Sequence, residues 1–348
     1  MKVYVALSGG VDSAIAAFLL DQKGYEVKGI FLKLLDDDKN NSTMLKERCA
    51  KRIAERLNIP FEVLDVSKEF KKEVIDYFIV EYINGKTPNP CVTCNQKIKI
   101  NLLLSLVKKN NCDLLATGHY VRLGYNKNRD SYYLHKGVDQ KKDQSYFLYR
   151  LKQSQLKRLI FPLGTMQKFE VKELARKKCL EEIVDQDSQE ICFVNGDYRN
   201  YITTYLNNKS GSKGHIMDLE GKIIGEHKGI FRYTVGQRKG LEIRSIRPYY
   251  VAKIDYNNNI IYAGEKENCY KKKIIIKDLV FTDENQPVSP LKVITKIRYN
   301  HLGGLSTIYP EDNRLTIEFD EPQLSPTPGQ SAVFYNYEGV LIGGGIIS

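Results

Sequence analysis

Residues 8–13, with the sequence SGGVDS, constrain the fold most, because they stand between an apolar segment and an amphipathic one. Residues 2–7 predict a buried strand, and residues 14–22 predict a helix that ends before Gly24. Two adjacent glycines let the backbone turn tightly and approach a phosphate closely. The free N–H groups and the dipole at the start of the helix then face the anion. We call residues 8–13 the glycine turn, and they predict a nucleotide-binding α/β fold.

Short strands and helices alternate through the first part of the chain. Residues 26–32, 61–66 and 114–117 predict further strands, and residues 44–57 and 98–109 predict helices. Such alternation is typical of a parallel sheet with helices on both faces. Ligands of these sheets bind beyond the carboxyl ends of the strands. The glycine turn lies at that edge.

The glycine turn predicts ATP as the ligand. Ser8 and Ser13 add hydroxyl donors, and Asp12 would hold Mg²⁺ against the phosphates. The sequence contains no G-x-x-x-x-G-K-[ST], which disfavours a Walker-type NTPase. The turn instead resembles that of the ATP pyrophosphatases, which adenylate a substrate oxygen and release pyrophosphate. A plain strand-to-helix turn capped by Asp12 or Ser13 is the competing interpretation.

The pattern of apolar residues changes after Phe193, where the helical periodicity becomes weaker. Residues 293–299, 314–319, 331–335 and 340–347 predict the strands of a small antiparallel barrel. A length of 348 residues also exceeds one ordinary core. We therefore predict three domains: a doubly wound parallel α/β domain at residues 1–200, a small central domain at residues 201–272 and a C-terminal antiparallel β-barrel at residues 273–348.

Charge and composition narrow the classes of protein. The formal net charge of +11 indicates a polyanionic partner, although lysines that serve solubility would give the same excess. No apolar run reaches the roughly 18 residues that span a bilayer, and the N-terminus does not resemble a signal peptide. We therefore expect a cytoplasmic protein that uses no membrane, whose seven cysteines form no disulfide framework.

Three cysteines stand in a distinctive setting. Cys91 and Cys94 form a C-x-x-C in or beside a proline-rich stretch, residues 85–93, which we expect to be an exposed functional loop. A C-x-x-C alone fits a redox pair, a metal site or coincidence. Structural zinc needs further ligands, and the sequence has no second C-x-x-C and no H-x-x-x-H. Beside a nucleotide site, Cys94 and the distant Cys192 become candidate nucleophiles for a carbon that adenylation has activated.

Nine motifs in one order extend over the whole chain. They are SGGVDS, TPNPxxxCNxxIK, ATGHY, KDQSYFL, SQEICF, HxG, YTVGQRKGL, KIRY and TPGQSAVFY. This series resembles the bacterial tRNA-specific 2-thiouridylases (the MnmA/TrmU family). The resemblance implies a cytoplasmic ATP pyrophosphatase-type enzyme with a barrel that cradles tRNA. It implies conversion of the wobble uridine of Lys, Glu and Gln tRNAs to 2-thiouridine, on a base flipped out of its stack.

The resemblance also implies roles for individual residues. ATP would contact Ala6, Leu7, Ser8, Gly9, Gly10, Val11, Asp12, Ser13, Leu32 and Gly118. The tRNA would contact His119, Lys142, Asp143, Gln144, Arg298, Tyr299 and Gln330. Cys192 would carry a persulfide from a sulfur donor such as a cysteine desulfurase or a relay protein. Cys94 would close a transient disulfide with Cys192 as the sulfur leaves.

One departure from the family pattern keeps a second mechanism open. Cys91 stands where many relatives have Asp in NPDxxCN. Cys91, Cys94 and Cys192 therefore also resemble the three-cysteine set of iron–sulfur-dependent tRNA thiolases, which holds a [4Fe–4S] cluster. Iron and sulfide assays on anaerobically purified protein separate cluster-bound sulfide from persulfide transfer.

Three functional alternatives also fit parts of the sequence. A pyrophosphatase-type enzyme on a small molecule predicts ATP turnover without tRNA. A non-catalytic RNA-binding protein predicts tRNA affinity without thiolation. A thiolase for another base or position would share every motif.

Overall fold

A five-stranded parallel sheet forms the N-terminal part of the protein. The computed structural model describes residues 1–36, 42–180, 191–206 and 211–348. In the sheet order β3-β2-β1-β4-β7, the strands are β1 (Lys2–Ala6), β2 (Glu26–Lys33), β3 (Phe61–Asp65), β4 (Leu114–Ala116) and β7 (Leu159–Ile160). The chain moves outward from β1 to β3 and then returns to β4. The strand order therefore reverses between β1 and β4, where such sheets bind ligands, and the predicted doubly wound class is confirmed.

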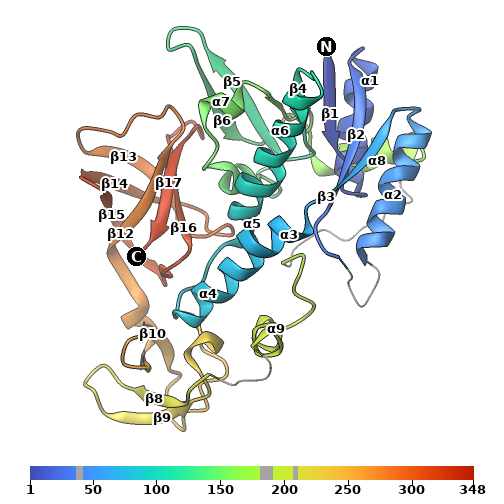
Figure 1. Cartoon of the computed structure of the whole chain (residues 1–348). Helices are drawn as coiled ribbons and strands as arrows, with labels where there is room; N and C mark the ends of the chain where they lie inside the picture. Colours follow the sequence, from blue (N-terminus) through green and yellow to red (C-terminus); the bar gives the residue numbers. More distant parts are fainter. Residues whose placement is uncertain (37–41, 181–190, 207–210) are drawn as a thin grey trace.

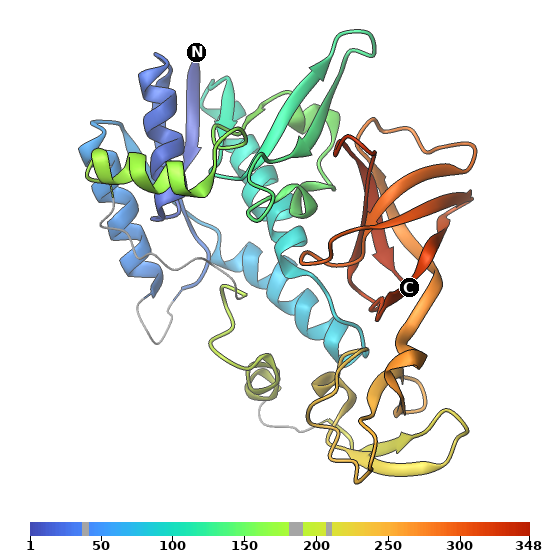
Figure 2. The same cartoon turned by 180° about the vertical axis from the view of Figure 1, so that it is seen from behind.

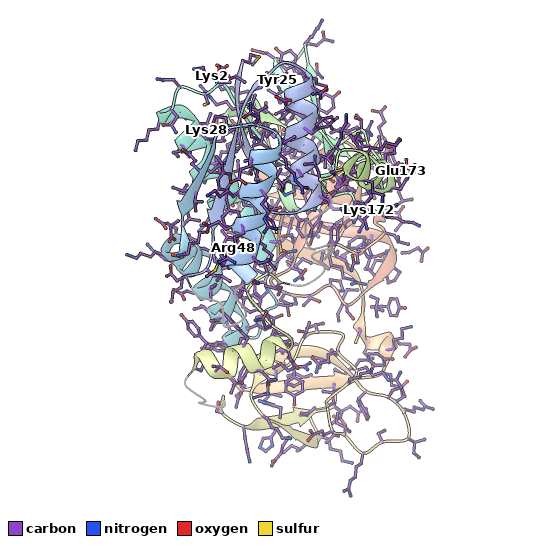
Figure 3. The ribbon with its side chains drawn as sticks, turned by 90° about the vertical axis from the view of Figure 1, so that its right-hand side faces the viewer. Lys2, Tyr25, Lys28, Arg48, Lys172 and Glu173 are labelled. Carbon is purple, nitrogen blue, oxygen red and sulfur yellow. The ribbon has the colours of Figure 1, made fainter. Side chains whose placement is uncertain are left out.

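Helices cover both faces of this sheet. They are α1 (Val11–Gln22), α2 (Ser42–Arg56) and α8 (Lys168–Lys177) on one face and α6 (Asn101–Lys109) on the other. Successive side chains of a strand point to opposite faces, so Val3 and Val5 pack with α1, α2 and α8, while Tyr4 packs with α6. Figure 3 shows the first flank, with Arg48 on α2 and Glu173 on α8. Both of these charged side chains are exposed.

Two long helical rods cross the middle of the molecule (Figure 1). The first joins α3 (Ser67–Phe70), a π-helical stretch η1 (Lys71–Asp76) and α4 (Tyr77–Ile83). The second joins α5 (Pro90–Thr93), a π-helical stretch η2 (Cys94–Ile100) and α6. The first rod was not predicted, and the second begins earlier than expected.

The prediction of a loop at residues 85–93 was wrong for residues 90–93, which are helical. Pro90 is the first residue of α5, a position that proline favours because its missing N–H is not needed there. The Asn89 side chain accepts a hydrogen bond from the Val92 N–H at 3.4 Å and caps the helix. The remaining turn, residues 85–89, is called the proline turn below.

Smaller elements follow the parallel sheet. A hairpin of β5 (Val121–Asn126) and β6 (Ser131–Lys136), which the sequence analysis missed, precedes the short helices η3 (Ser145–Leu148) and α7 (Gln153–Leu156). After α9 (Tyr198–Tyr205) comes a four-stranded central sheet, in the order β10-β11-β8-β9. Its strands are β8 (Gly214–Met217), β9 (Ile223–His227), β10 (Tyr250–Asp255) and β11 (Ile260–Gly264), with η4 (Ile230–Arg232) and η5 (Lys266–Cys269) beside them.

The C-terminal strands close into a barrel in the order β12-β15-β14-β13-β16-β17. They are β12 (Tyr270–Phe281), β13 (Leu291–Lys296), β14 (Gly304–Glu311), β15 (Arg314–Leu324), β16 (Ser331–Tyr335) and β17 (Leu341–Ile347). Every pairing is antiparallel, as predicted, and apolar side chains such as Ile308, Phe319 and Phe334 fill the interior. Closure leaves no unpaired edge. The strand β14 was not predicted, and β13 ends before Arg298.

The barrel and the parallel sheet lie on opposite sides of the helical rods, with the central sheet below them (Figure 1). Figure 2 shows the same arrangement from behind. The barrel shares a core with the N-terminal part, because Tyr146 and Tyr149 pack with Val333 and Tyr335. The Tyr146 hydroxyl donates to the Ser331 carbonyl at 2.9 Å. Among the described residues, every helix is too short or too polar to cross a membrane.

The proline turn touches both of the following domains. The Gln330 side chain donates to the Thr87 carbonyl at 2.8 Å, and the Thr87 N–H donates to the Pro328 carbonyl at 2.8 Å. The Thr87 hydroxyl lies 3.2 Å from that of Thr234 in the central region. A Cβ on Gly85 would lie 2.8 Å from the Ile254 side chain. The turn that leads into α5 is therefore held from three directions.

Candidate active site

The glycine turn is a preformed anion-binding loop. The Ser13 hydroxyl accepts the Ser8 N–H at 3.1 Å and donates to the Gly10 carbonyl at 2.9 Å, which fixes the curve of the backbone. Gly10 precedes α1 and has no side chain that could cap the helix. Among the described residues, no side chain at the N-cap therefore accepts a hydrogen bond from the amides of the first turn. Gly9 has φ of +81°, and a Cβ there would lie 2.5 Å from the Lys46 carbonyl oxygen. The arrangement suits a phosphate.

Asp12 of the glycine turn is already paired. Lys168, the first residue of α8, donates to both carboxylate oxygens at 2.7 and 2.8 Å. The Tyr120 hydroxyl donates to the same carboxylate at 2.7 Å. The sequence analysis missed Lys168, because only the fold brings it to a partner 156 positions away.

Gly118 and His119 extend the site from the glycine turn toward the helical rods. A Cβ on Gly118 would lie 2.9 Å from backbone atoms of Asp12 and Ser13, so the two backbones are in direct contact. His119 follows, and its Nδ1 lies 2.7 Å from the Thr117 hydroxyl. Burial, with a smaller contribution from Lys99, lowers the pKa of His119 to about 3. The imidazole is therefore neutral at physiological pH. Leu32 is half-buried near the end of β2.

The pH dependence of stability should report on His119. Because its pKa is about 3 in the folded protein and ordinarily 6.5, the unfolded chain binds more protons between these values. Folded-state stability is therefore complete above pH 6.5 and falls as the pH is lowered toward 3. We expect His119→Gln to reduce the loss of Tm between neutral pH and about pH 5. Thermal unfolding across pH tests this, with exposed His215→Gln as control; an unchanged slope in His119→Gln would contradict it.

The structure brings the three candidate cysteines together. Cys94 is buried at the start of η2, and Cys91 is half-buried in α5 immediately before it. Cys192 is exposed, and the next residue, Phe193, anchors it by packing edge-on against Phe70 at 5.7 Å and Phe78 at 5.3 Å. Phe193 and Cys94 belong to the same apolar cluster. We call Cys91, Cys94 and Cys192 the thiol cluster; the rest of the SQEICF motif before residue 191 lies outside the described residues.

The resting thiols are protonated. Burial raises the pKa of Cys94 to about 12 and that of Cys91 to about 11, and the neighbouring Cys192 raises both further. Desolvation also raises the pKa of Cys192, whose side chain reaches solvent from a position surrounded by protein. Lys99 opposes the shift at all three thiols. Since the thiolate is the nucleophile, the state of this site depends on nearby positive charge.

The thiol cluster does not fit a metal site as it stands. No three His, Cys, Asp or Glu side chains in the described ranges are arranged to hold a metal ion, and all three cysteines lie within those ranges. An iron–sulfur cluster bound by three thiolates would require such an arrangement.

Several residues expected to contact tRNA participate in internal hydrogen bonds. Asp143 is buried, and its carboxylate accepts the N–H groups of Gly137 and Ser145, each at 3.1 Å. The Gln144 side chain accepts the Tyr120 N–H at 3.0 Å. Gln330 holds the proline turn as described above, and Lys142 is half-buried. These side chains fix the framework around the site in this structure.

Arg298 and Tyr299 lie in the turn after β13, next to the N-terminal domain. The Tyr299 ring packs on Phe147, with centroids 4.5 Å apart, and the Lys296 ammonium lies 5.7 Å from its centre. Arg298 donates to the Leu324 carbonyl at 3.1 Å. Leu302, in the same turn region, is 96% exposed. We call the place where the turn after β13 packs against the N-terminal domain the seam. It combines basic, aromatic and exposed apolar side chains.

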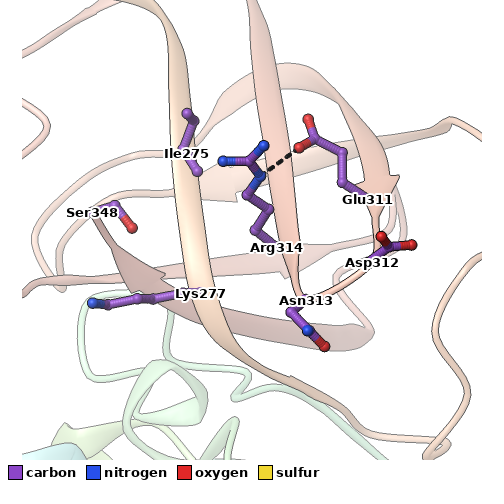
Figure 4. Close-up of a pocket in the computed structure, with 7 residues that line it drawn as sticks. All are labelled: Ile275, Lys277, Glu311, Asp312, Asn313, Arg314 and Ser348. Atoms are coloured by element: carbon purple, nitrogen blue, oxygen red, sulfur yellow. Dashed lines mark hydrogen bonds and ion pairs between the residues drawn. The ribbon is translucent and has the colours of Figure 1, made fainter.

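A separate hollow lies on the barrel (Figure 4). Its lining residues are Ile275, Lys277, Glu311, Asp312, Asn313, Arg314 and Ser348. Arg314 and Glu311 pair with each other at 2.7 Å, and the lining includes no thiol or imidazole. The hollow therefore has no part in the active site.

A parallel sheet with an anion-binding turn at the carboxyl edge of its strands is the fold of an ATP pyrophosphatase-type enzyme. A protein described as tRNA-specific 2-thiouridylase MnmA from Syntrophomonas wolfei is 45% identical over 347 residues, covering 99% of this chain and 100% of that protein. A protein of the same description from Clostridioides difficile is 42% identical over 356 residues, covering 99% and 98%. The chain belongs to the family of tRNA-specific 2-thiouridylases.

The family domains follow the three parts of the fold. Residues 1–196 match a tRNA methyl transferase HUP domain, residues 199–265 a tRNA methyl transferase PRC-barrel domain, and residues 271–347 an aminomethyltransferase beta-barrel domain. Among solved structures, the U34-tRNA thiolase NcsA from Methanococcus maripaludis with its [4Fe-4S] cluster is 20% identical, with a TM-score of 0.37, over 60% of this chain and 65% of that one. Similarity at this level transfers neither ligand nor activity.

Proposed function

We propose that this protein activates the C2 carbonyl of the wobble uridine of tRNA with ATP and replaces its oxygen by sulfur. The observation that supports the proposal is a series of neighbours that leads from the glycine turn to the thiols. Gly118 contacts the glycine turn, and His119 is the next residue. Lys99 affects the pKa of both His119 and Cys94. A phosphate site and a sulfur site thus adjoin one another. The expected acceptors are the Lys, Glu and Gln tRNAs, in the cytoplasm.

The first half-reaction is adenylation of the base. The amides of the glycine turn and the dipole of α1 would bind the triphosphate. The uracil O2 attacks the α-phosphorus, pyrophosphate leaves, and a poor leaving oxygen becomes part of an AMP group. Mg²⁺ would supply charge neutralisation of the phosphates, and the Asp12 carboxylate is a suitable hard ligand once it exchanges its pairing with Lys168. His119, which is neutral, would contact the base without adding charge.

The second half-reaction transfers sulfur. A donor such as a cysteine desulfurase or a relay protein would load the exposed Cys192 as a persulfide. Its terminal sulfur attacks C2, and AMP leaves. The Cys94 thiolate then attacks the Cys192 sulfur, so that a Cys94–Cys192 disulfide forms and the S–S bond to the base breaks, leaving 2-thiouridine. A thiol reductant restores both cysteines.

The barrel and the central region would position the tRNA. We place the domain limits at residues 1–200, 201–272 and 273–348, with tRNA reaching the thiols along the seam between the barrel and the first domain. Lys142, Asp143 and Gln144 line the same region as Tyr299, because Phe147 of the KDQSYFL motif packs on Tyr299. Gln330 would support tRNA binding in this region through its hydrogen bond to the proline turn.

Nucleoside mass spectrometry tests the proposal directly. Purified protein, ATP, unmodified tRNA and a persulfide donor should yield 2-thiouridine at the wobble position, with AMP and pyrophosphate as co-products. The same experiment on iron-free protein separates the mechanisms. Activity that requires added iron and sulfide would overturn persulfide transfer, and ATP turnover without tRNA would favour a small-molecule substrate.

Arg298→Ala should weaken tRNA binding several-fold and reduce its salt dependence by about one released counterion, because one phosphate contact is lost. ATP binding should be unchanged. The measurement is tRNA affinity at several salt concentrations. Arg314→Ala is the matched control, since Arg314 also projects from the barrel but pairs with Glu311 in the remote hollow. Equal tRNA affinity of both variants would place the RNA elsewhere.

A further inference from the structure

Lys99 lies on the same side of η2 as the buried Cys94. The stretch Cys94–Ile100 is π-helical, with hydrogen bonds between residues five apart. Cys94 and Lys99 are five positions apart, so the two side chains lie one turn from each other on one face. Single π-turns inserted in α-helices occur often at functional sites. Here the π-turn brings an ammonium to a thiol.

The surroundings of Lys99 differ from those of an ordinary structural lysine. It is half-buried, and no residue in the described ranges forms a hydrogen bond or an ion pair with it. Desolvation lowers the pKa of Lys99, but the neighbouring thiols of Cys94, Cys192 and Cys91, in that order of effect, together raise it above the usual 10.5. Within the described residues no carboxylate acts on Lys99 to offset its lost hydration. An ionised thiol of the cluster would supply a counter-ion there.

Two other lysines show that this setting is specific. Lys97, two positions earlier on η2, is exposed and pairs with Glu73 on η1 at 2.5 Å. Lys296 is half-buried on the barrel, and desolvation lowers its pKa, as burial alone does. Lys99 is shifted in the opposite direction because thiols surround it.

We propose that Lys99 is a positioning residue whose ammonium stabilises the thiolate of Cys94 as Cys94 ionises to attack Cys192. This inference rests on the proposed sulfur transfer. In that step the Cys94 proton leaves to solvent, the Cys94–Cys192 bond forms, and the bond between Cys192 and the departing sulfur breaks. Lys99 keeps its proton throughout. The ionisable groups that act on Cys94 are Lys99 of η2, Cys192 of the segment before α9 and Cys91 of α5, and only Lys99 favours the thiolate.

The step can be observed without ATP or tRNA. In a background with Cys91, Cys112 and Cys179 replaced by serine, an aromatic disulfide reagent loads the exposed Cys192 as a mixed disulfide and releases one coloured thiolate. Attack by Cys94 then closes the Cys94–Cys192 disulfide and releases the second. The rate of this second release against pH follows ionisation of Cys94, and mass spectrometry confirms the product. Loss of the second release in Cys94→Ser verifies the assignment.

We expect Lys99→Met to slow the second release about ten-fold or more at neutral pH and to move its midpoint to higher pH, since one pKa unit is a ten-fold change in thiolate. Lys99→Arg should restore most of the rate, and Lys97→Met should behave like the parent. A Lys99→Met midpoint equal to the parent's would overturn the inference. So would a raised KM for ATP with an unchanged midpoint, which would make Lys99 a phosphate ligand. A normal shift in a protein that makes no 2-thiouridine would instead retain this role and reject the proposed function.

Discussion

Replacing Cys94 by serine is expected to lower the rate of 2-thiouridine formation at least about a thousand-fold, because the variant cannot release sulfur from Cys192. The hydroxyl of serine is a far weaker nucleophile toward sulfur than a thiolate. ATP binding and tRNA binding should remain, since serine is close to cysteine in size and Cys94 is expected to contact neither the triphosphate nor the tRNA backbone. The measurement combines nucleoside mass spectrometry with pyrophosphate release and tRNA affinity. Cys192→Ser should have an equally large effect.

A matched control separates chemistry from packing. Cys49 is also a buried cysteine, but it lies in the core between the sheet and α2. Cys49→Ser should reduce stability by about 1–3 kcal/mol through burial of a hydroxyl, while the folded enzyme keeps its thiolation rate. If Cys94→Ser retained more than a tenth of the parent rate, transient disulfide formation would be excluded as the release step.

Gly9→Ala is expected to lower the affinity for ATP about a hundred-fold or more, since displacements near 1 Å in a binding geometry have effects of that size. The added Cβ would lie 2.5 Å from the Lys46 carbonyl oxygen, and the residue has φ of +81°. The obstructing atom belongs to the backbone, so no side-chain rotation relieves the contact. Either the glycine turn or α2 must shift. Equilibrium binding of ATP and the Tm of the variant are the measurements.

Gly24→Ala isolates the effect of close approach. Gly24 has a similar φ of +77°, but a Cβ there meets nothing within 4 Å. This variant should lose about 1 kcal/mol of stability from the left-handed backbone and bind ATP normally. Equal ATP affinity of Gly9→Ala and Gly24→Ala would show that the contact between the glycine turn and α2 is dispensable for the nucleotide.

The sequence predicted those parts of the fold in which local pattern and final environment agree. The strand β15 alternates buried and more exposed side chains, and β1, β16 and β17 are short, mostly buried runs. These patterns, like the glycine turn, lie in adjacent residues, so each could be recognised alone. The first helical rod was missed because its π-helical stretch η1 disturbs the helical repeat. The hairpin β5–β6 was missed because its polar tip interrupts the apolar pattern.

The site was predictable only where a motif supplied it. The three cysteines were identified from sequence, whereas Lys99 and Lys168 were not, although Lys99 ends the TPNPxxxCNxxIK motif. A lysine among 53 basic residues has no distinguishing local signal. The role of each lysine depends on the groups that the fold places around it. These groups are three thiols for Lys99 and the carboxylate of Asp12 for Lys168.

The proline turn has a consequence for how the enzyme can be divided. Gln330 of the barrel, Thr234 of the central region and the start of α5 all meet at Thr87. A fragment ending before the barrel would keep every residue of the nucleotide site, yet it would lose the braces on the segment that carries Cys91 and Cys94. Such a fragment should still bind or hydrolyse ATP, but its rate of sulfur transfer should fall. If tRNA docks on the barrel as proposed, the same short stretch of backbone would connect that docking to the alignment of Cys91 and Cys94.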